Sequence, residues 1–223
     1  MKKDIFPDTL KTWIERKLLE GDAGRGAVNC HVMEIYSVPL GVYCRGIPAR
    51  DLGDPEDLVR GFFSDRLDRE DFFENWQSSD LRLRRWLMNA FAFYLKEQRR
   101  KKIRDQRLQP LEIDPLGSTE ETDKAIDKAF AISIVRKALA DARDVCAAKG
   151  LHQHWEIFYR HYYEGLNYKD FIDEYGVTSL RAAEMARSAA SRFRRSLRLT
   201  IASDGARESE IDDEIESFLD ATA

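Results

Sequence analysis

Aromatic residues at helical spacing on both sides of a short turn constrain the fold of this chain more than any other feature. Before the turn the apolar positions are Trp155, Phe158, Tyr159 and Tyr162, and after it they are Tyr168, Phe171, Ile172 and Tyr175. The turn itself is Glu164-Gly165-Leu166-Asn167. Apolar residues that recur every three or four positions line one face of a helix. The pattern predicts two amphipathic helices, the second one shorter, joined tightly.

A second turn and a basic segment come next. Gly176 can supply the left-handed backbone that ends a helix, Val177 can fill the core, and Thr178 can cap a new helix that runs to about Arg198. Residues 178–198 carry six arginines against one glutamate, a net charge of +5. This order predicts a helix-turn-helix motif, whose second helix enters the major groove of DNA. The alternative is a solvated arginine face on an ordinary bundle helix.

Composition favours a soluble, strongly helical protein. The 223 residues are 43% hydrophobic and 34% charged, with six prolines, so we expect an all-α fold of one or two small domains. No apolar run could span a bilayer and no signal peptide follows the first basic residues, which predicts a cytoplasmic protein that does not contact membranes.

Neither a metal site nor catalysis is expected. Cys30, Cys44 and Cys146 form no CxxC pair, and the histidines lack the spacing of zinc ligands. The chain also lacks a glycine-rich phosphate loop, an HExxH motif and a nucleophile elbow. We therefore expect no cofactor and no enzymatic activity.

Charge is segregated along the chain, although the net charge is only −4. Residues 82–107 hold ten basic and two acidic residues, a net charge of +8. Acidic stretches surround this block, with net charges of −7 over residues 51–80, −4 over 112–128 and −7 over 204–223. Because binding of a polyanion depends on where the charges lie, this net charge does not exclude nucleic acid as a partner.

Helix signals also mark the first half of the chain. We expect a helix over about residues 10–18, a glycine-bearing break around 21–26 and a helix through 32–43. Asp54-Pro55-Glu56-Asp57 combines an N-cap, a proline at the first helical position and acidic residues in the first turn. A further helix over about 83–102 ends in a cationic cluster.

Three segments, in this order, resemble a known family. DPEDLVRGFFSDRL (54–67), RRWLMNAFAFYLKEQRRKK (84–102) and GLNYKDFIDEYGVT (165–178) resemble regions 2 and 4 of a sigma-70-family RNA polymerase sigma factor of the extracytoplasmic-function type. The resemblance covers about residues 40–198. It implies a region 2-like helical domain over 1–102, an acidic linker over 103–124, and a region 4-like helix-turn-helix domain over 125–200. An acidic amphipathic tail over 201–223 follows.

The resemblance implies a polymerase-binding surface on the helix that begins near Pro55. Its candidate residues are Asp57, Leu58, Arg60 and Phe62. The family usually has Gln where Arg60 stands and Glu where Gly61 stands. For Leu58 and Phe62 the alternative is an ordinary place in the core, and for Phe62 it is the favoured one.

The next segment would meet the single-stranded minus-10 element, which needs cations for phosphates and an aromatic face or pocket for an unstacked base. The candidates are Trp76, Arg82, Arg84, Arg85, Lys96, Arg99 and Arg100. For Trp76 the alternative is a lid on the core. Phe93 and Glu97 depart from the Asn and Asp that are usual in the family.

The last helix would contact the duplex minus-35 element, where arginine can bind guanine bidentately or bind phosphate. The candidates are Thr178, Ser179, Arg181, Glu184, Arg187 and Ser188. Ala182, Ala186 and Ala189 are predicted to form the packing side. Glu184 and Met185 stand where the family favours Lys, Ser or Arg, and the alternative is a helix-turn-helix retained only for protein contact.

The tail after residue 203 carries Ile211, Ile215, Phe218 and Leu219 at helical spacing on an acidic helix. One hypothesis is that this helix lies across the arginine-rich helix 178–198 and restrains DNA binding. The alternative is a packed terminal helix.

Together these patterns predict a sigma factor that binds core RNA polymerase and promoter DNA, with an anti-sigma factor as a further partner that the family allows. Two alternatives remain at this point. One is a free-standing helix-turn-helix transcriptional regulator, which would bind duplex DNA without polymerase. The other is a sigma-like adaptor, which would bind protein without opening a promoter.

Overall fold

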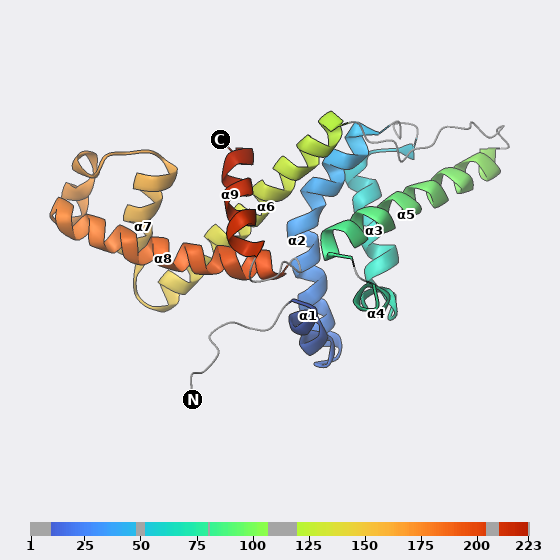
Figure 1. Ribbon diagram of the computed structural model, residues 1–223, viewed down its shortest axis with the longest axis horizontal. Helices are drawn as coiled ribbons and strands as arrows, with labels where there is room; N and C mark the ends of the chain where they lie inside the picture. Colours follow the sequence, from blue (N-terminus) through green and yellow to red (C-terminus); the bar gives the residue numbers. More distant parts are fainter. Residues whose placement is uncertain (1–9, 48–51, 80, 107–119, 204–209, 223) are drawn as a thin grey trace. The chain divides into compact units, whose positions relative to one another are not determined.

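The computed structural model describes residues 10–47, 52–79, 81–106, 120–203 and 210–222. Every regular element in these ranges is helical, which confirms the all-α prediction (Figure 1). The contacts divide the chain into two compact units, Met1–Ser133 with Ile201–Ala223, and Ile134–Thr200. The domain bounds that we expected from the sequence stay a prediction, and most of the expected linker lies outside the described ranges.

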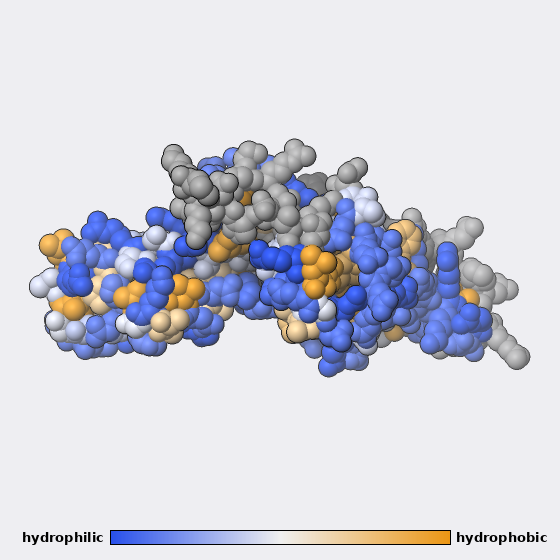
Figure 2. All heavy atoms as spheres, turned by 90° about the horizontal axis from the view of Figure 1, so that it is seen from below, coloured by the Kyte–Doolittle hydropathy of each residue, from blue (hydrophilic) through white to orange (hydrophobic). Residues whose placement is uncertain are grey.

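Figure 2 shows one face on which small groups of hydrophobic side chains are separated by hydrophilic ones. None of the helices in the described ranges is both long and apolar enough to cross a membrane.

The first unit contains helices from both ends of the chain. They are α1 (Leu10–Leu18), α2 (Asp22–Gly46), α3 (Pro55–Leu67), α4 (Phe72–Gln77), α5 (Leu83–Gln106), the part of α6 (Glu120–Ala148) that ends at Ser133, and α9 (Ile211–Thr222). The expected break over residues 21–26 is shorter than predicted. Gly21, with φ of 71°, separates α1 from α2, and the helix then continues through Gly24 and Gly26.

Aromatic rings fill the core of the first unit. Phe62 of α3 is fully buried and lies 5.2 Å, ring centre to ring centre, from Phe91 of α5 and 5.8 Å from Tyr94. Edge-to-face contacts of this kind add to the stabilisation from apolar burial. The start of α3 is as predicted, because the Asp54 carboxylate accepts hydrogen bonds from the backbone amides of Glu56, at 2.8 Å, and Asp57. This cap and core fix α3 beside α5.

The second unit is built from α6 after Ser133, α7 (His152–Phe158), a π-helix η2 (Tyr159–Tyr163), the 3-10 turns η3 (Tyr168–Asp170) and η4 (Ile172–Tyr175), and α8 (Ser179–Ser203) up to Thr200. Its core combines aromatic residues before α8 with alanines on α8. The buried members are Ala142, Cys146, Trp155, Ile157, Phe158, Phe171, Ile172, Ala182, Met185, Ala186, Ala189 and Ala190.

The predicted short helix over residues 168–175 is wrong in detail, because two 3-10 turns replace it. Phe171, with φ of −143°, separates the turns, and the Glu174 amide donates to the Phe171 carbonyl at 3.2 Å. Phe171 and Ile172 are both buried. The φ of Phe171 lies outside the α-helical range, so the backbone does not continue as one α-helix through this residue.

Candidate nucleic-acid interface

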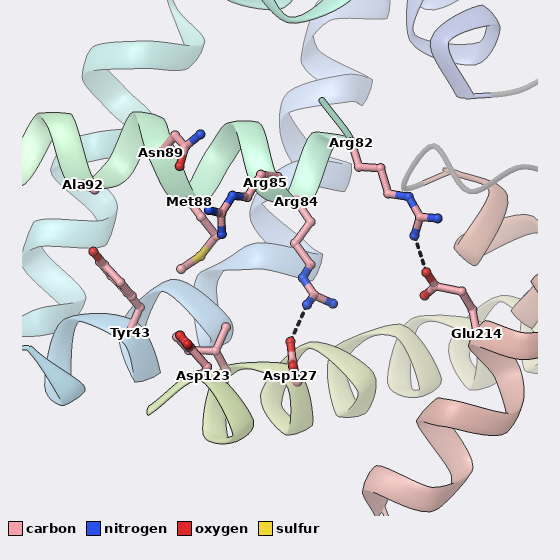
Figure 3. Close-up of a pocket in the computed structure, with 11 residues that line it drawn as sticks. Tyr43, Arg82, Arg84, Arg85, Met88, Asn89, Ala92, Asp123, Asp127 and Glu214 are labelled. Atoms are coloured by element: carbon pink, nitrogen blue, oxygen red, sulfur yellow. Dashed lines mark hydrogen bonds and ion pairs between the residues drawn. The ribbon is translucent and has the colours of Figure 1, made fainter. Parts of the chain in front are cut away.

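The α5 arginine cluster, which we define as Arg82, Arg84 and Arg85, lies at the beginning of α5. It lines an open hollow of about 790 Å³ in the first unit, together with Tyr43, Asp127 and other residues. The Arg82 guanidinium forms ion pairs with Glu210, at 2.6 Å, and with Glu214. Arg84 forms an ion pair with Asp127 of α6 (Figure 3). The cluster is therefore cationic but already faces carboxylates.

Arg84 also contacts an aromatic ring of the core. Its guanidinium carbon lies 4.8 Å from the centre of the Phe130 ring. Phe130 is buried and contacts Tyr36, with 5.6 Å between ring centres. Arg85 is exposed. Arg84 thus helps to hold the first part of α6 within the first unit, and Arg85 is the cation more available to an external anion.

The other predicted minus-10 cations lie farther along the same helix. Lys96 is 14 positions after Arg82, a distance of about 21 Å along a helix axis. Helical periodicity places Arg85, Lys96 and Arg100 on one face of α5. Lys96 and Arg99 are partly exposed and Arg100 is exposed. The predicted cations thus form a row along α5 instead of a single cluster.

Trp76 is not on this surface. It is only 1% exposed, and its indole nitrogen donates to the Leu81 carbonyl at 3.0 Å. The prediction that it stacks on a base is therefore not supported by this structure, and the alternative, a lid on the core, describes it. Trp76 lies in α4, whose neighbours Phe72 and Phe73 are also buried.

Phe93 is the aromatic residue that sequence reasoning missed as a site. Its side chain is 61% exposed, and the Lys96 ammonium lies 6.0 Å from its ring centre. It shares the face of Arg85 and Arg100 by helical periodicity. It also borders a hollow of about 310 Å³ that is lined by Phe72, Asn75, Leu81, Trp86, Asn89 and other residues. The sequence signal that could have identified it is its position eight residues after Arg85, three before Lys96 and seven before Arg100.

On α3 the predicted polymerase-binding residues are divided. Asp57 and Arg60 are exposed and form an ion pair one turn apart. Leu58 is 8% exposed and Phe62 is fully buried, so both lie in the core as the alternative stated. A Cβ at Gly61 would lie 2.5 Å from the Tyr94 hydroxyl, so a larger residue there would require the Tyr94 side chain to move.

The second candidate surface is the exposed face of α8 in the second unit. Gly176 has a left-handed backbone, with φ of 62° and ψ of 33°, and Val177 packs against the core. The Thr178 hydroxyl accepts a hydrogen bond from the Arg181 amide at 3.3 Å, and the Thr178 carbonyl accepts from the Ala182 amide at 2.8 Å. These contacts confirm the predicted helix stop, plug and cap.

The two sides of α8 differ as predicted. Ala182, Ala186 and Ala189 are fully buried. Ser179, Arg181, Glu184 and Arg187 are exposed. Small side chains on the packing side lie in the core of the second unit, and long ones remain in solvent.

Not every predicted minus-35 residue is equally available. The Arg181 guanidinium pairs with Glu184 at 3.0 Å, and the Arg187 Nε donates to the Ala183 carbonyl at 3.3 Å. The Ser188 hydroxyl accepts a hydrogen bond from Arg192 at 2.7 Å and is only partly exposed. Arg181 and Arg187 are the two arginines of the set and both are exposed, so they are the best placed to contact an external anion.

The pKa of His154 in α7 is affected by the arginines of this surface. Burial lowers the pKa of its imidazole, and the positive charges of Arg181 and Arg192 lower it further. Its Nδ1 atom is buried without a hydrogen-bond partner. The imidazole is thus held neutral behind the arginine face.

Comparisons of the chain with protein-family models, with curated proteins and with solved structures find no match.

Proposed function

We propose that this protein is a cytoplasmic sigma factor of the extracytoplasmic-function type, which binds core RNA polymerase and directs the recognition and opening of promoters. The first unit would hold the single-stranded minus-10 element, and the second would bind the duplex minus-35 element. The polymerase would supply the catalysis. The proposal starts from the sequence resemblance and is supported by the properties of two surfaces.

The surface on α8 suits a DNA groove. The helix begins behind a capped turn, exposes Arg181 and Arg187 in its first three turns, and packs through alanines on the other side. Helix-turn-helix proteins present the N-terminal residues of such a helix to base edges. The α8 surface therefore supports the proposal, although a solvated arginine face also occurs on ordinary bundle helices.

The surface on α5 suits an unstacked strand, and this observation carries the proposal. Phe93 exposes an aromatic ring beside Lys96, on the same helix face as Arg85 and Arg100, at the border of an apolar hollow. Proteins that bind single strands combine cations for phosphates with aromatic rings on which bases stack. A regulator that binds only duplex DNA would not need this combination.

The test is run-off transcription with purified core polymerase and a library of genomic fragments from the organism that encodes the protein. We expect discrete start sites that depend on the protein. Asp57→Arg should abolish them, because it reverses an exposed charge on the proposed polymerase-binding surface. Glu70→Arg is the matched control, since it makes the same charge change at an exposed position outside α3.

The Phe93 surface is tested in the same assay with Phe93→Ala and Phe93→Leu. Loss of a stacked base costs about 1–3 kcal/mol, so both variants should weaken promoter opening while binding to polymerase is kept. Binding of duplex DNA without polymerase, with no new start sites, would instead favour the free-standing regulator. Binding to polymerase without promoter opening would favour the adaptor.

A further inference from the structure

The acidic end of the chain contacts the α5 arginine cluster within the first unit. Arg82 uses one terminal nitrogen for Glu210, at 2.6 Å, and the other for Glu214 (Figure 3). The two carboxylates are 36% and 23% exposed, so both are partly removed from solvent. Both donor arms of the guanidinium are thus engaged by residues that lie 128 and 132 positions later in the chain.

An apolar contact fixes this acidic segment. Ile211, the first residue of α9, is 2% exposed, and it lies between the two glutamates that contact Arg82. Residues 204–223 carry eight acidic residues and one basic residue. The hypothesis drawn from sequence placed this helix on the arginine-rich segment 178–198. That hypothesis stays a prediction, and within the first unit the ion pairs connect Glu210 and Glu214 to Arg82.

Carboxylates and phosphates compete for the same guanidinium donors, because both offer paired oxygen acceptors to the planar fork of arginine. A DNA phosphate that approaches Arg82 therefore competes with Glu210 and Glu214 for the same guanidinium donors. We infer that the start of α9 is an internal competitor, which occupies Arg82 at the beginning of the row of α5 cations until nucleic acid displaces it. This inference rests on the proposed function, since it assigns the α5 surface to single-stranded DNA.

The first experiment measures binding of the full-length protein to a fluorescent single-stranded DNA oligonucleotide at several salt concentrations. Glu210→Gln with Glu214→Gln should raise the affinity by roughly 2- to 30-fold, because two partly exposed ion pairs no longer oppose binding. Asp213→Gln with Glu216→Gln is the matched control. It removes the same charge from exposed positions of the same helix, so it should change affinity much less.

The second experiment tests the contact without DNA. A double-mutant cycle with Arg82→Gln and Glu214→Gln, followed by urea unfolding, should show coupling equal to roughly a 1.5- to 5-fold change in the unfolding equilibrium constant. Absence of coupling would overturn the inference, since the ion pair would then not exist in solution. Equal affinity gains in the charge-removal and control variants would overturn it too, because net charge alone would explain them.

The inference and the proposed function can fail separately. If the protein never supports transcription but removal of Glu210 and Glu214 charge raises oligonucleotide affinity selectively, the internal competitor stands and the sigma-factor proposal falls. If transcription depends on the protein and the same variant gains no affinity beyond its control, the sigma-factor proposal stands and the internal competitor falls. Gained affinity should also disappear when Arg82→Gln is added to the Glu210 and Glu214 variant.

Discussion

Replacing Arg84 and Arg85 separately should distinguish a structural role from a DNA-binding role on one turn of α5. Arg84 is 34% exposed, pairs with Asp127 and lies 4.8 Å from the centre of the Phe130 ring. An exposed cation–aromatic contact contributes about 0.5–1 kcal/mol. The ion pair adds about 0.2–0.5 kcal/mol, near the low end for surface pairs, because Asp127 is 55% exposed. Arg84→Gln should therefore lower the free energy of unfolding by about 1 kcal/mol.

Arg85→Gln is the comparison, because Arg85 is exposed on the adjacent position. A surface substitution of this kind changes the free energy of unfolding by less than about 0.5 kcal/mol. If both side chains bind phosphates, Arg85→Gln should reduce the slope of log affinity against log salt by about 0.7 for a single strand. Arg84→Gln should reduce it by less, because Arg84 exchanges the Asp127 carboxylate for a phosphate. The two variants should thus differ both in stability and in salt dependence.

Urea unfolding followed by tryptophan fluorescence can measure the stability term. In a Trp155→Phe background the remaining tryptophans, Trp13, Trp76 and Trp86, all belong to the first unit, so the signal reports that unit. Oligonucleotide titrations supply the salt slopes. Equal stability of the Arg84 and Arg85 variants would refute the structural role that we assign to Arg84.

Three further predictions concern packing, capping and pH. Gly24→Ala should lower the free energy of unfolding by about 1–3 kcal/mol, because its Cβ would lie 1.7 Å from the Lys17 carbonyl oxygen. Gly26→Ala, at an exposed position of the same helix, should raise it by about 0.5–1 kcal/mol, and chemical denaturation measures both changes. Thr178→Ala should cost the second unit about 1 kcal/mol through loss of the α8 cap, measurable by hydrogen exchange. His154 has a lowered pKa in the folded state, so the stability that its neutral form contributes above the unfolded value of about 6.5 is lost as pH falls toward the folded pKa. The free energy of unfolding of His154→Gln, measured at a series of pH values, should therefore decrease less on acidification than that of the original protein.

Local signals in the sequence predicted those parts of the fold that depend on local interactions. The Asp54 cap, the Gly176 stop and the Thr178 cap are each formed by residues within four positions of one another. The alanine face of α8 was predicted from the family resemblance together with the spacing of the alanines along the helix. These features involve backbone groups and side chains that are neighbours in any helix of this sequence.

Burial of individual aromatic residues could not be predicted in the same way. Trp76 and Phe93 are both aromatic residues near basic segments, yet one is 1% and the other 61% exposed. The difference depends on the helices that pack around them, which a local pattern does not specify. The 3-10 turns over 168–175 were missed as well, because apolar periodicity predicts which residues face the core but not the non-helical backbone at Phe171.

The contact between Arg82 and the acidic end of the chain shows how segregated charges affect what the candidate nucleic-acid surfaces can bind. Three of the arginines in the candidate surfaces, Arg82, Arg84 and Arg181, already pair with carboxylates. When such an arginine exchanges a carboxylate for a phosphate, DNA releases a counterion but the freed carboxylate attracts one. The measured salt slope should therefore be smaller than the number of arginines in contact with DNA would give. Removing the carboxylates should steepen the slope as well as raise the affinity, and this joint change separates competition from a simple change in net charge.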